Sequence, residues 1–162
     1  MKTLKDIKPG QGIEIEEVET QVTPRTQARR VALQALYQWQ MTHEIGHVII
    51  KQFSEDGLLG DLDLELFREL LLQVSDNSEQ LDALYAPMLD RSVSMIDPIE
   101  KAIMRIGVYE LQSMPQIPYK VIINECVELS KRFGAEDGHK YINGILDKVA
   151  KTLRPLELSE KM

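Results

Sequence analysis

The residues best suited to binding chemistry gather in one short stretch near the C-terminus. Four polar or aromatic side chains crowd the first turn of a predicted helix: His139, Lys140, Tyr141 and Asn143. A lysine at a helix N-terminus suits a phosphate, a tyrosine ring suits the face of a base, and an asparagine amide suits a base edge. Because folding alone does not require this combination, the stretch predicts a contact with nucleic acid. A solvated first turn is the competing interpretation.

The residues just before this turn have the pattern of one helix ending and another starting. Lys131 and Arg132 place cations in a last turn, and Gly134 follows as a residue that can take a positive φ. Asp137 then offers a short carboxylate to the free N–H groups of the next helix. The apolar positions of that helix recur every three or four residues: Ile142, Ile145, Leu146, Val149 and Leu153.

A second group of cations lies near the N-terminus. Arg25, Arg29 and Arg30 cluster at the start of a helix predicted from Thr26, away from most of its apolar stripe. The positive end of a helix dipole slightly disfavours cations in the first turn, so helix stability does not account for them. We therefore predict a basic face able to bind phosphates, with ordinary solvated arginines as the alternative.

The segment His43-Glu44-Ile45-Gly46-His47 matches the zincin pattern H-E-x-x-H. On a continuous helix this spacing places two imidazoles on one face beside a general-base glutamate. Gly46 weakens such a helix, and the only further histidine, His139, is distant in the sequence. We expect a chance match in a helix–helix connection, with no metal and no catalytic residue, and keep a zinc peptidase as an unfavoured alternative.

The charge of the chain is unevenly distributed. The formal net charge is −7, yet residues 55–90 hold ten acidic side chains and one arginine. Residues 23–54 hold four basic side chains and one acidic one. A phosphate responds to the local field, so a basic face can bind nucleic acid while the opposite side repels it.

Composition places the chain among ordinary globular proteins. Its 162 residues fit one domain that buries most of a core. No apolar run is long enough to span a membrane, and the start of the sequence lacks the apolar core of a signal peptide. The single cysteine, Cys126, falls at an apolar helical position, which favours a reduced core residue and a cytoplasmic protein.

Helical periodicity runs through most of the sequence. Helices are predicted from Thr26 onward, around 48–53, over 62–89 with a break near 75–78, from Asp97 to Pro115, over 119–133 and over 138–153. The start at Asp97 is the clearest, because an N-cap aspartate, Pro98 and Glu100 match the capping pattern. No strand pair is evident, so we predict an all-α fold of about seven helices. Residues 1–23 are expected to form a flexible extension.

Three segments together resemble the NusB family of bacterial transcription antitermination factors. They are Gln27–Gln40, Pro118–Glu125, and the signature from Arg132-Phe133-Gly134-Ala135-Glu136-Asp137 to Asn143-Gly144-Ile145-Leu146-Asp147. The resemblance covers about residues 24–156, leaving 1–23 as an extension and 157–162 as a C-terminal tail. It implies an all-helical RNA-binding domain of two packed helical subdomains, the second beginning near Asp97.

The resemblance also implies a function in binding and assembly, without catalysis or cofactor. The protein would bind single-stranded boxA RNA of ribosomal RNA leaders together with the ribosomal protein NusE, and other antitermination factors and RNA polymerase would join through that complex. The RNA-binding residues implied by matching family positions are Arg25, Arg29, Lys140, Tyr141 and Asn143. The residues themselves add Arg30, an extra base next to the family's basic motif, together with Asp137 and His139. Tyr37 and Glu100 are the residues implied for the partner. The acidic character of residues 62–90 and of the helix over 97–110 also suits docking of a basic ribosomal protein. Thr26 and Gln27 depart from the family's richest basic motif.

Two further alternatives remain open at this stage. The family's fold also occurs as the N-terminal domain of ribosomal RNA cytosine methyltransferases, which need a large methyl-donor-binding domain downstream, whereas this sequence ends at Met162. A structural protein-interaction module that binds no nucleic acid is the other. Salt-dependent RNA binding would separate that module from the main hypothesis.

Overall fold

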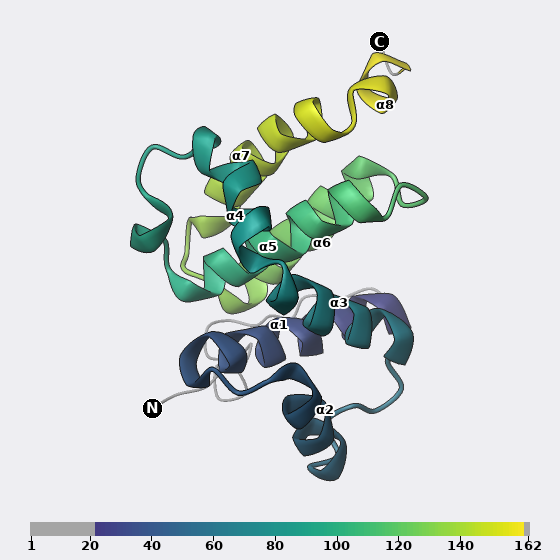
Figure 1. Ribbon diagram of the computed structural model, residues 1–162. Coiled ribbons are helices and arrows are strands. Elements are labelled where there is room, and N and C mark those ends of the chain that lie inside the picture. Colours follow the sequence, from purple (N-terminus) through teal and green to yellow (C-terminus); the bar gives the residue numbers. More distant parts are fainter. Residues whose placement is uncertain (1–21, 161–162) are drawn as a thin grey trace. The chain divides into compact units, whose positions relative to one another are not determined.

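The computed structural model describes residues 22–160, and within that range the chain is helical with no strand (Figure 1). The predicted all-α fold class is confirmed. The chain divides into two compact units between Asp76 and Asn77. Most of the extension predicted over residues 1–23 lies outside the described residues.

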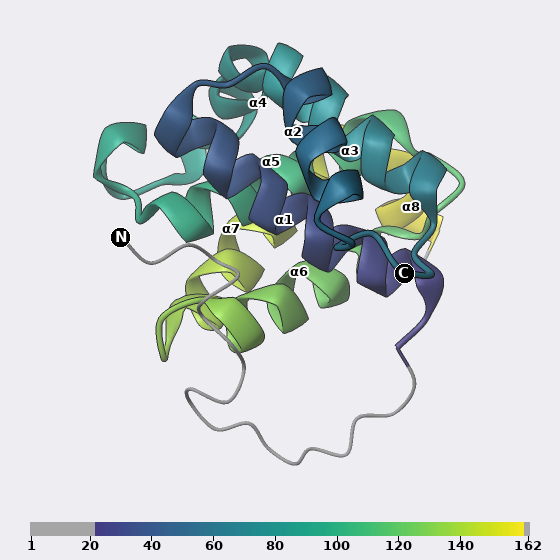
Figure 2. The same ribbon diagram turned by 90° about the horizontal axis from the view of Figure 1, so that it is seen from below.

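The N-terminal unit is built from three helices. They are α1 (Pro24–Thr42), α2 (Gly46–Glu55) and α3 (Leu64–Asp76). The Thr23 side chain caps α1 by accepting a hydrogen bond from the backbone N–H of Thr26. Helices α1 and α3 lie side by side (Figures 1 and 2), and both bury apolar stripes, including Leu33 and Leu36 of α1 and Phe67 and Leu70 of α3.

The helix predicted over 62–89 is two helices that belong to different units. The chain breaks at Asn77, where the sequence suggested a break, and continues as α4 (Ser78–Tyr85). The second unit therefore begins about twenty residues before the expected position near Asp97. A partly buried ion pair joins α4 to α5 of the C-terminal unit: Arg105 donates from Nε and Nη2 to the two carboxylate oxygens of Asp82 at 2.8 and 2.7 Å. The Tyr85 hydroxyl donates to the same carboxylate.

The C-terminal unit is arranged around one central helix. Its elements after α4 are the short 3-10 helices η2 (Ala86–Met88) and η3 (Val93–Met95), then α5 (Pro98–Ser113), α6 (Tyr119–Phe133), α7 (Gly138–Leu153) and α8 (Pro155–Glu160). Asp97 caps α5 by accepting from the N–H groups of Ile99 and Glu100, as predicted. Every residue from Ala102 to Leu111 is buried, because α4, α6 and α7 all contact α5.

Helix α7 ends at Leu153, and Pro155 starts α8 where a tail was expected from residue 157. Arg154, between the two helices, is buried and donates hydrogen bonds to the carbonyl oxygens of Leu111, Ile117 and Met114 at 2.8 to 3.0 Å. Glu157 pairs with Arg154 and accepts a hydrogen bond from the backbone N–H of Tyr119. These bonds fix the start of α8 against the end of α5 and the start of α6.

Candidate nucleic-acid interface

Helices α6 and α7 form a hairpin, and the residues between them differ in detail from the sequence prediction. Helix α6 ends at Phe133 with Lys131 and Arg132 in its last turn, as expected. Gly134, however, has φ −96° and ψ −172°, so it does not take a left-handed conformation. A Cβ at this position would lie 2.9 Å from the Ser130 carbonyl oxygen, which explains why glycine suits this position.

Asp137 stands at the N-cap position of α7, but its side chain makes no capping hydrogen bond. Its φ and ψ of −105° and 12° differ from the extended backbone of a usual N-cap. The carboxylate instead lies 3.8 Å from the Lys140 ammonium. The predicted capping role is therefore wrong, and the carboxylate of Asp137 stays exposed at the start of α7.

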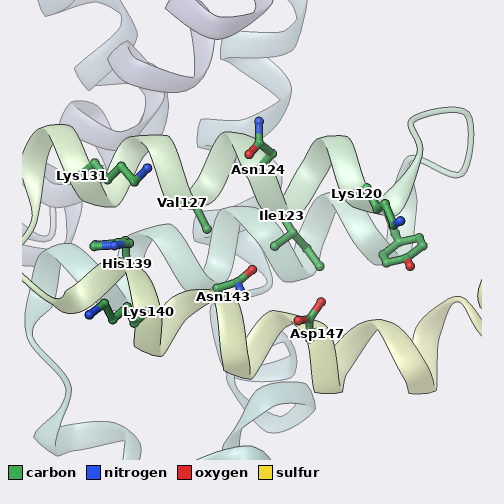
Figure 3. A pocket seen from close by; sticks show the side chains of 10 residues that line it. Lys120, Ile123, Asn124, Val127, Lys131, His139, Lys140, Asn143 and Asp147 are labelled. Atoms are coloured by element: carbon green, nitrogen blue, oxygen red, sulfur yellow. The ribbon is translucent and has the colours of Figure 1, made fainter. Parts of the chain in front are cut away.

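An open groove of about 370 Å³ lies between the two helices of the hairpin (Figure 3). Because the helices run in opposite directions, Lys131 at the end of α6 lies near His139 and Lys140 at the start of α7. The lining residues are Tyr119, Lys120, Ile123, Asn124, Val127, Lys131, His139, Lys140, Asn143 and Asp147. The fold thus brings three of the predicted RNA-binding residues, His139, Lys140 and Asn143, into one groove.

The groove is basic and polar with an apolar floor. Lys120, Lys131 and Lys140 line it against one carboxylate, that of Asp147. Lys140 and Lys131 pair with Asp137 and Glu128 at 3.8 and 3.5 Å, but all four side chains are at least half exposed. Exposed pairs of this kind contribute little free energy, so the ammonium groups can exchange a carboxylate for a phosphate.

Two polar side chains of different accessibility line the groove beside the lysines. The amide of Asn143 belongs to an exposed residue at the groove wall and suits the edge of an unpaired base. His139 also lines the groove, but its Nδ1 atom is buried and has no hydrogen-bond partner among the described residues, so this atom is not accessible to a base.

Tyr141 lies on α7 but does not line the groove. It comes one residue after Lys140, a rotation of about 100° around the helix axis. Its hydroxyl donates to Asp90 Oδ1 at 3.2 Å, and the Arg91 guanidinium carbon lies 4.8 Å from the ring centroid. Burial raises the pKa of the Tyr141 phenol, the Arg91 guanidinium opposes this rise, and the Asp90 carboxylate adds to it. Tyr141 thus forms a second exposed cluster with Asp90 and Arg91.

The three arginines of α1 have different surroundings. Arg25 is exposed and its guanidinium lies 3.5 Å from the Asp63 carboxylate. Arg30 is half-buried, whereas Arg29 is only 2% exposed. The prediction that Arg29 belongs to a basic face able to bind phosphates is wrong, because its side chain is buried. Its buried guanidinium is not accessible to a phosphate from solvent.

The residues predicted for a protein partner are both half-buried. Tyr37 lies in α1, and Glu100 lies in the first turn of α5. The Glu100 carboxylate lies so close to Gly138, the first residue of α7, that a Cβ there would overlap it. Burial raises the pKa of Glu100 and the nearby Asp97 carboxylate raises it further, while Arg91 lowers it. Glu110 is fully buried, so it does not belong to the acidic surface expected over 97–110.

The H-E-x-x-H segment spans a connection between helices, as predicted. His43 ends α1 with a left-handed φ of 63°, and α2 begins at Gly46. The two histidines therefore do not share the face of one helix, which the zincin pattern requires. Among residues 22–160, no group of three metal-ligating side chains lies together. No helix in that range is long and apolar enough to cross a membrane.

Several residues of the groove and of the Asp90, Arg91 and Tyr141 cluster were not predicted from the sequence. Lys120, Asn124 and Lys131 belong to α6 and line the groove, but the sequence analysis gave no binding role to any of them and placed Lys131 only in a last turn. Asp90 and Arg91 lie in the connection between η2 and η3, and both contact Tyr141, which is 51 positions from Asp90. A charge count along α6 could have suggested the lysines, whereas no local signal connects Arg91 with Tyr141.

Comparison with known proteins identifies the family. The sequence model of the NusB family matches residues 26–151. The transcription antitermination protein NusB of Hydrogenovibrio crunogenus is 61% identical over 157 residues, which are 97% of this chain and 98% of that protein. The protein of the same name from Mannheimia succiniciproducens is 46% identical over 138 residues, covering 85% and 96% of the two chains.

Solved structures agree with this assignment. NusB of T. maritima superposes with a TM-score of 0.74 at 26% identity, covering 86% of this chain and 99% of that one. A crystal structure of the antitermination factors NusB and NusE in complex with double-stranded RNA gives 0.72 at 25% identity, covering 80% and 97%. By family model, relatives and fold alike, the chain belongs to the NusB family.

Proposed function

We propose that this protein is a transcription antitermination factor that binds single-stranded boxA RNA of ribosomal RNA leaders together with the ribosomal protein NusE. Through this complex and further antitermination factors it promotes read-through by RNA polymerase. It acts in the cytoplasm by binding and assembly, without catalysing a reaction. The relatives named transcription antitermination proteins support this proposal, as does the similar structure in which NusB and NusE accompany RNA.

The observation that carries the proposal is the lysine-lined groove between α6 and α7. Three ammonium groups along its two walls suit the phosphates of an extended strand. The Asn143 amide lines the same groove and suits a base edge, and the His139 ring lies beside it. We propose that phosphates lie along the lysines while the bases of the bound strand meet these polar side chains.

The other residues predicted from the sequence have different roles in this proposal. Arg25 and Arg30 contribute to the field at the start of α1, where Arg25 would exchange Asp63 for a phosphate. Asp137 is exposed and could accept from a base amino group. Arg29 is left out because its side chain is buried. For the partner, Glu100 and Tyr37 remain proposed contacts, with the acidic side chains of α3 and α4 attracting a basic ribosomal protein.

Lysine substitutions in the groove test the proposal directly. Lys120→Ala, Lys131→Ala and Lys140→Ala should each weaken binding of boxA RNA and reduce the salt slope of log K by about 0.7. The control is Lys148→Ala, which removes an exposed lysine of α7 that does not line the groove. Fluorescence anisotropy at several salt concentrations measures both quantities.

The same titrations with duplex RNA test whether single-stranded RNA, the proposed ligand, is preferred over double-stranded RNA. We expect tighter binding of the single strand, because its bases can reach His139 and Asn143. If the three groove variants and Lys148→Ala bind RNA alike, the groove is not the binding site. If the wild-type protein binds no RNA either alone or with NusE, the proposed function is wrong.

A further inference from the structure

The cluster of Asp90, Arg91 and Tyr141 lies outside the groove, and its geometry is unusual for three exposed or half-exposed side chains. The Asp90 carboxylate accepts from Arg91 Nε at 2.8 Å and from the Tyr141 hydroxyl at 3.2 Å. Arg91 is simultaneously held over the Tyr141 ring, 4.8 Å from its centroid. Each side chain of the three thus contacts the other two, across the connection between η2 and η3 and the first turn of α7.

Stability of the fold does not explain this arrangement. The side chains of Asp90 and Arg91 are 69% and 48% exposed, and an ion pair at such exposure contributes little free energy. Holding an arginine and a tyrosine in one orientation also costs side-chain entropy. An aromatic ring held in place at the surface suits a ligand that stacks, because the ordering cost is already met before binding.

We propose that Asp90 and Arg91 are positioning residues that hold Tyr141 for stacking on one unpaired base of the bound RNA. This inference rests on the proposed function. Asp90 orients the ring through its hydroxyl, and the planar guanidinium of Arg91 supports one face of the ring. The N–H groups of Arg91 that Asp90 does not occupy can reach the phosphate of the same nucleotide.

The proposed role of Arg91 requires a planar guanidinium over the Tyr141 ring, and not only a positive charge. Arginine stacks through its flat guanidinium and keeps its donors in the plane, whereas lysine carries a compact point charge. Arg91→Lys should therefore preserve the salt slope of RNA binding while losing the support of the ring. Arg91→Ala should lose both, and Asp90→Asn should lose part of the orienting hydrogen bond while keeping the side-chain shape.

A double-mutant cycle with Tyr141 tests the proposal in the full-length protein with boxA RNA. Tyr141→Ala should weaken binding about 5- to 150-fold, the range expected for one stacked base. Arg91→Ala should weaken it severalfold, and in the Tyr141→Ala background only the reduction in salt slope of about 0.7 should remain. Arg68→Ala, which removes another exposed arginine, is the matched control and should change nothing.

RNAs that each lack one base locate the stacked nucleotide. One abasic position should weaken binding to the wild-type protein but not to Tyr141→Ala, and the loss should be smaller in Arg91→Ala. Melting temperatures should change little in all variants, because Asp90 and Arg91 are exposed and Tyr141 is only partly buried. A change in melting temperature with RNA affinity intact would identify Tyr141 as a packing residue and overturn the inference.

The outcomes distinguish this inference from the proposed function. If the groove lysine variants weaken RNA binding but Arg91→Ala leaves it unchanged or tightens it, the groove proposal stands and the positioning role is wrong. Additive losses from Arg91→Ala and Tyr141→Ala would likewise reject the positioning role, since they would show two independent contacts. If neither the groove nor the cluster affects RNA binding, both proposals fail.

Discussion

Glu100 carries a negative charge that its surroundings disfavour. Burial raises its pKa, Asp97 adds to the effect, and Arg91 partly opposes it. The folded protein therefore binds this proton more tightly than the unfolded chain does. Stability should fall as the pH rises through the interval between the ordinary glutamate pKa and the raised one. A carboxylate kept at this position despite that cost is consistent with its proposed role in binding a basic partner.

Glu100→Gln should raise the melting temperature at neutral pH, because the amide keeps the shape and removes the disfavoured charge. The gain should disappear once the pH falls below about 4.3, where glutamate is protonated in both states. Thermal unfolding monitored by circular dichroism across this range measures it, with the exposed Glu136→Gln as control. A loss of stability instead would show that the positive end of the α7 dipole, beside Gly138, stabilises the carboxylate more than burial disfavours it.

The elements of the C-terminal unit pack closely around α5, and Gly107 lies where α6 and α7 both approach it. A Cβ at Gly107 would lie 2.8 Å from Leu146 Cδ1 of α7 and 3.0 Å from Cys126 Sγ of α6. Gly144, in the middle of α7, has no such neighbour within 4 Å. The two helical glycines therefore differ in purpose: one permits three helices to meet, and the other weakens its own helix.

Alanine at these two glycines should have opposite effects on stability. Gly107→Ala should lower the free energy of unfolding by about 1–3 kcal/mol through overpacking against Leu146 and Cys126. Gly144→Ala should raise it by about 0.5–1 kcal/mol, since alanine is the better helix former and its methyl group meets open space. Urea unfolding of both variants measures the difference. Equal effects would mean that Leu146 moves aside without cost and that the close approach does not constrain the helices.

The charges of the whole molecule separate into regions that suit two different ligands. The groove of the C-terminal unit presents three lysines, whereas residues 55–90 carry ten acidic side chains and one arginine. A net charge of −7 works against RNA binding at long range, so affinity for RNA alone should be modest. A basic partner on the acidic surface would add positive field and phosphate contacts of its own.

Partner and RNA should therefore bind cooperatively. A coupling free energy in the usual range corresponds to a rise in RNA affinity of about 5- to 150-fold when NusE is bound, and RNA should raise the affinity for NusE by the same factor. Titration of boxA RNA into the protein alone and into the preformed pair measures the factor. Glu100→Lys should weaken partner binding and remove the rise in RNA affinity that NusE causes. The affinity for RNA in the absence of NusE should stay unchanged. Equal dissociation constants in the two wild-type titrations would contradict cooperative assembly.

The sequence by itself determined the helices and the family. Periodicity predicted α5, α6 from residue 119 and α7 from residue 138, and the cap at Asp97 also gave the start of α5, because the hydrogen bonds and caps of a helix involve residues only a few positions apart. The same local character explains why the connection at His43 and the break near Asn77 could be predicted. The family signature was readable because its residues occupy short contiguous segments.

Only the tertiary structure decided which charged side chains are accessible at the surface. Arg29, Arg105 and Glu110 have ordinary polar helical positions in the sequence, yet all three are buried. The groove likewise depends on the pairing of α6 with α7, and the Arg91 contact joins residues 50 positions apart in a connection and a helix. Burial and long-range pairing depend on which elements pack together, and packing is a property of the assembled helices that no local pattern encodes.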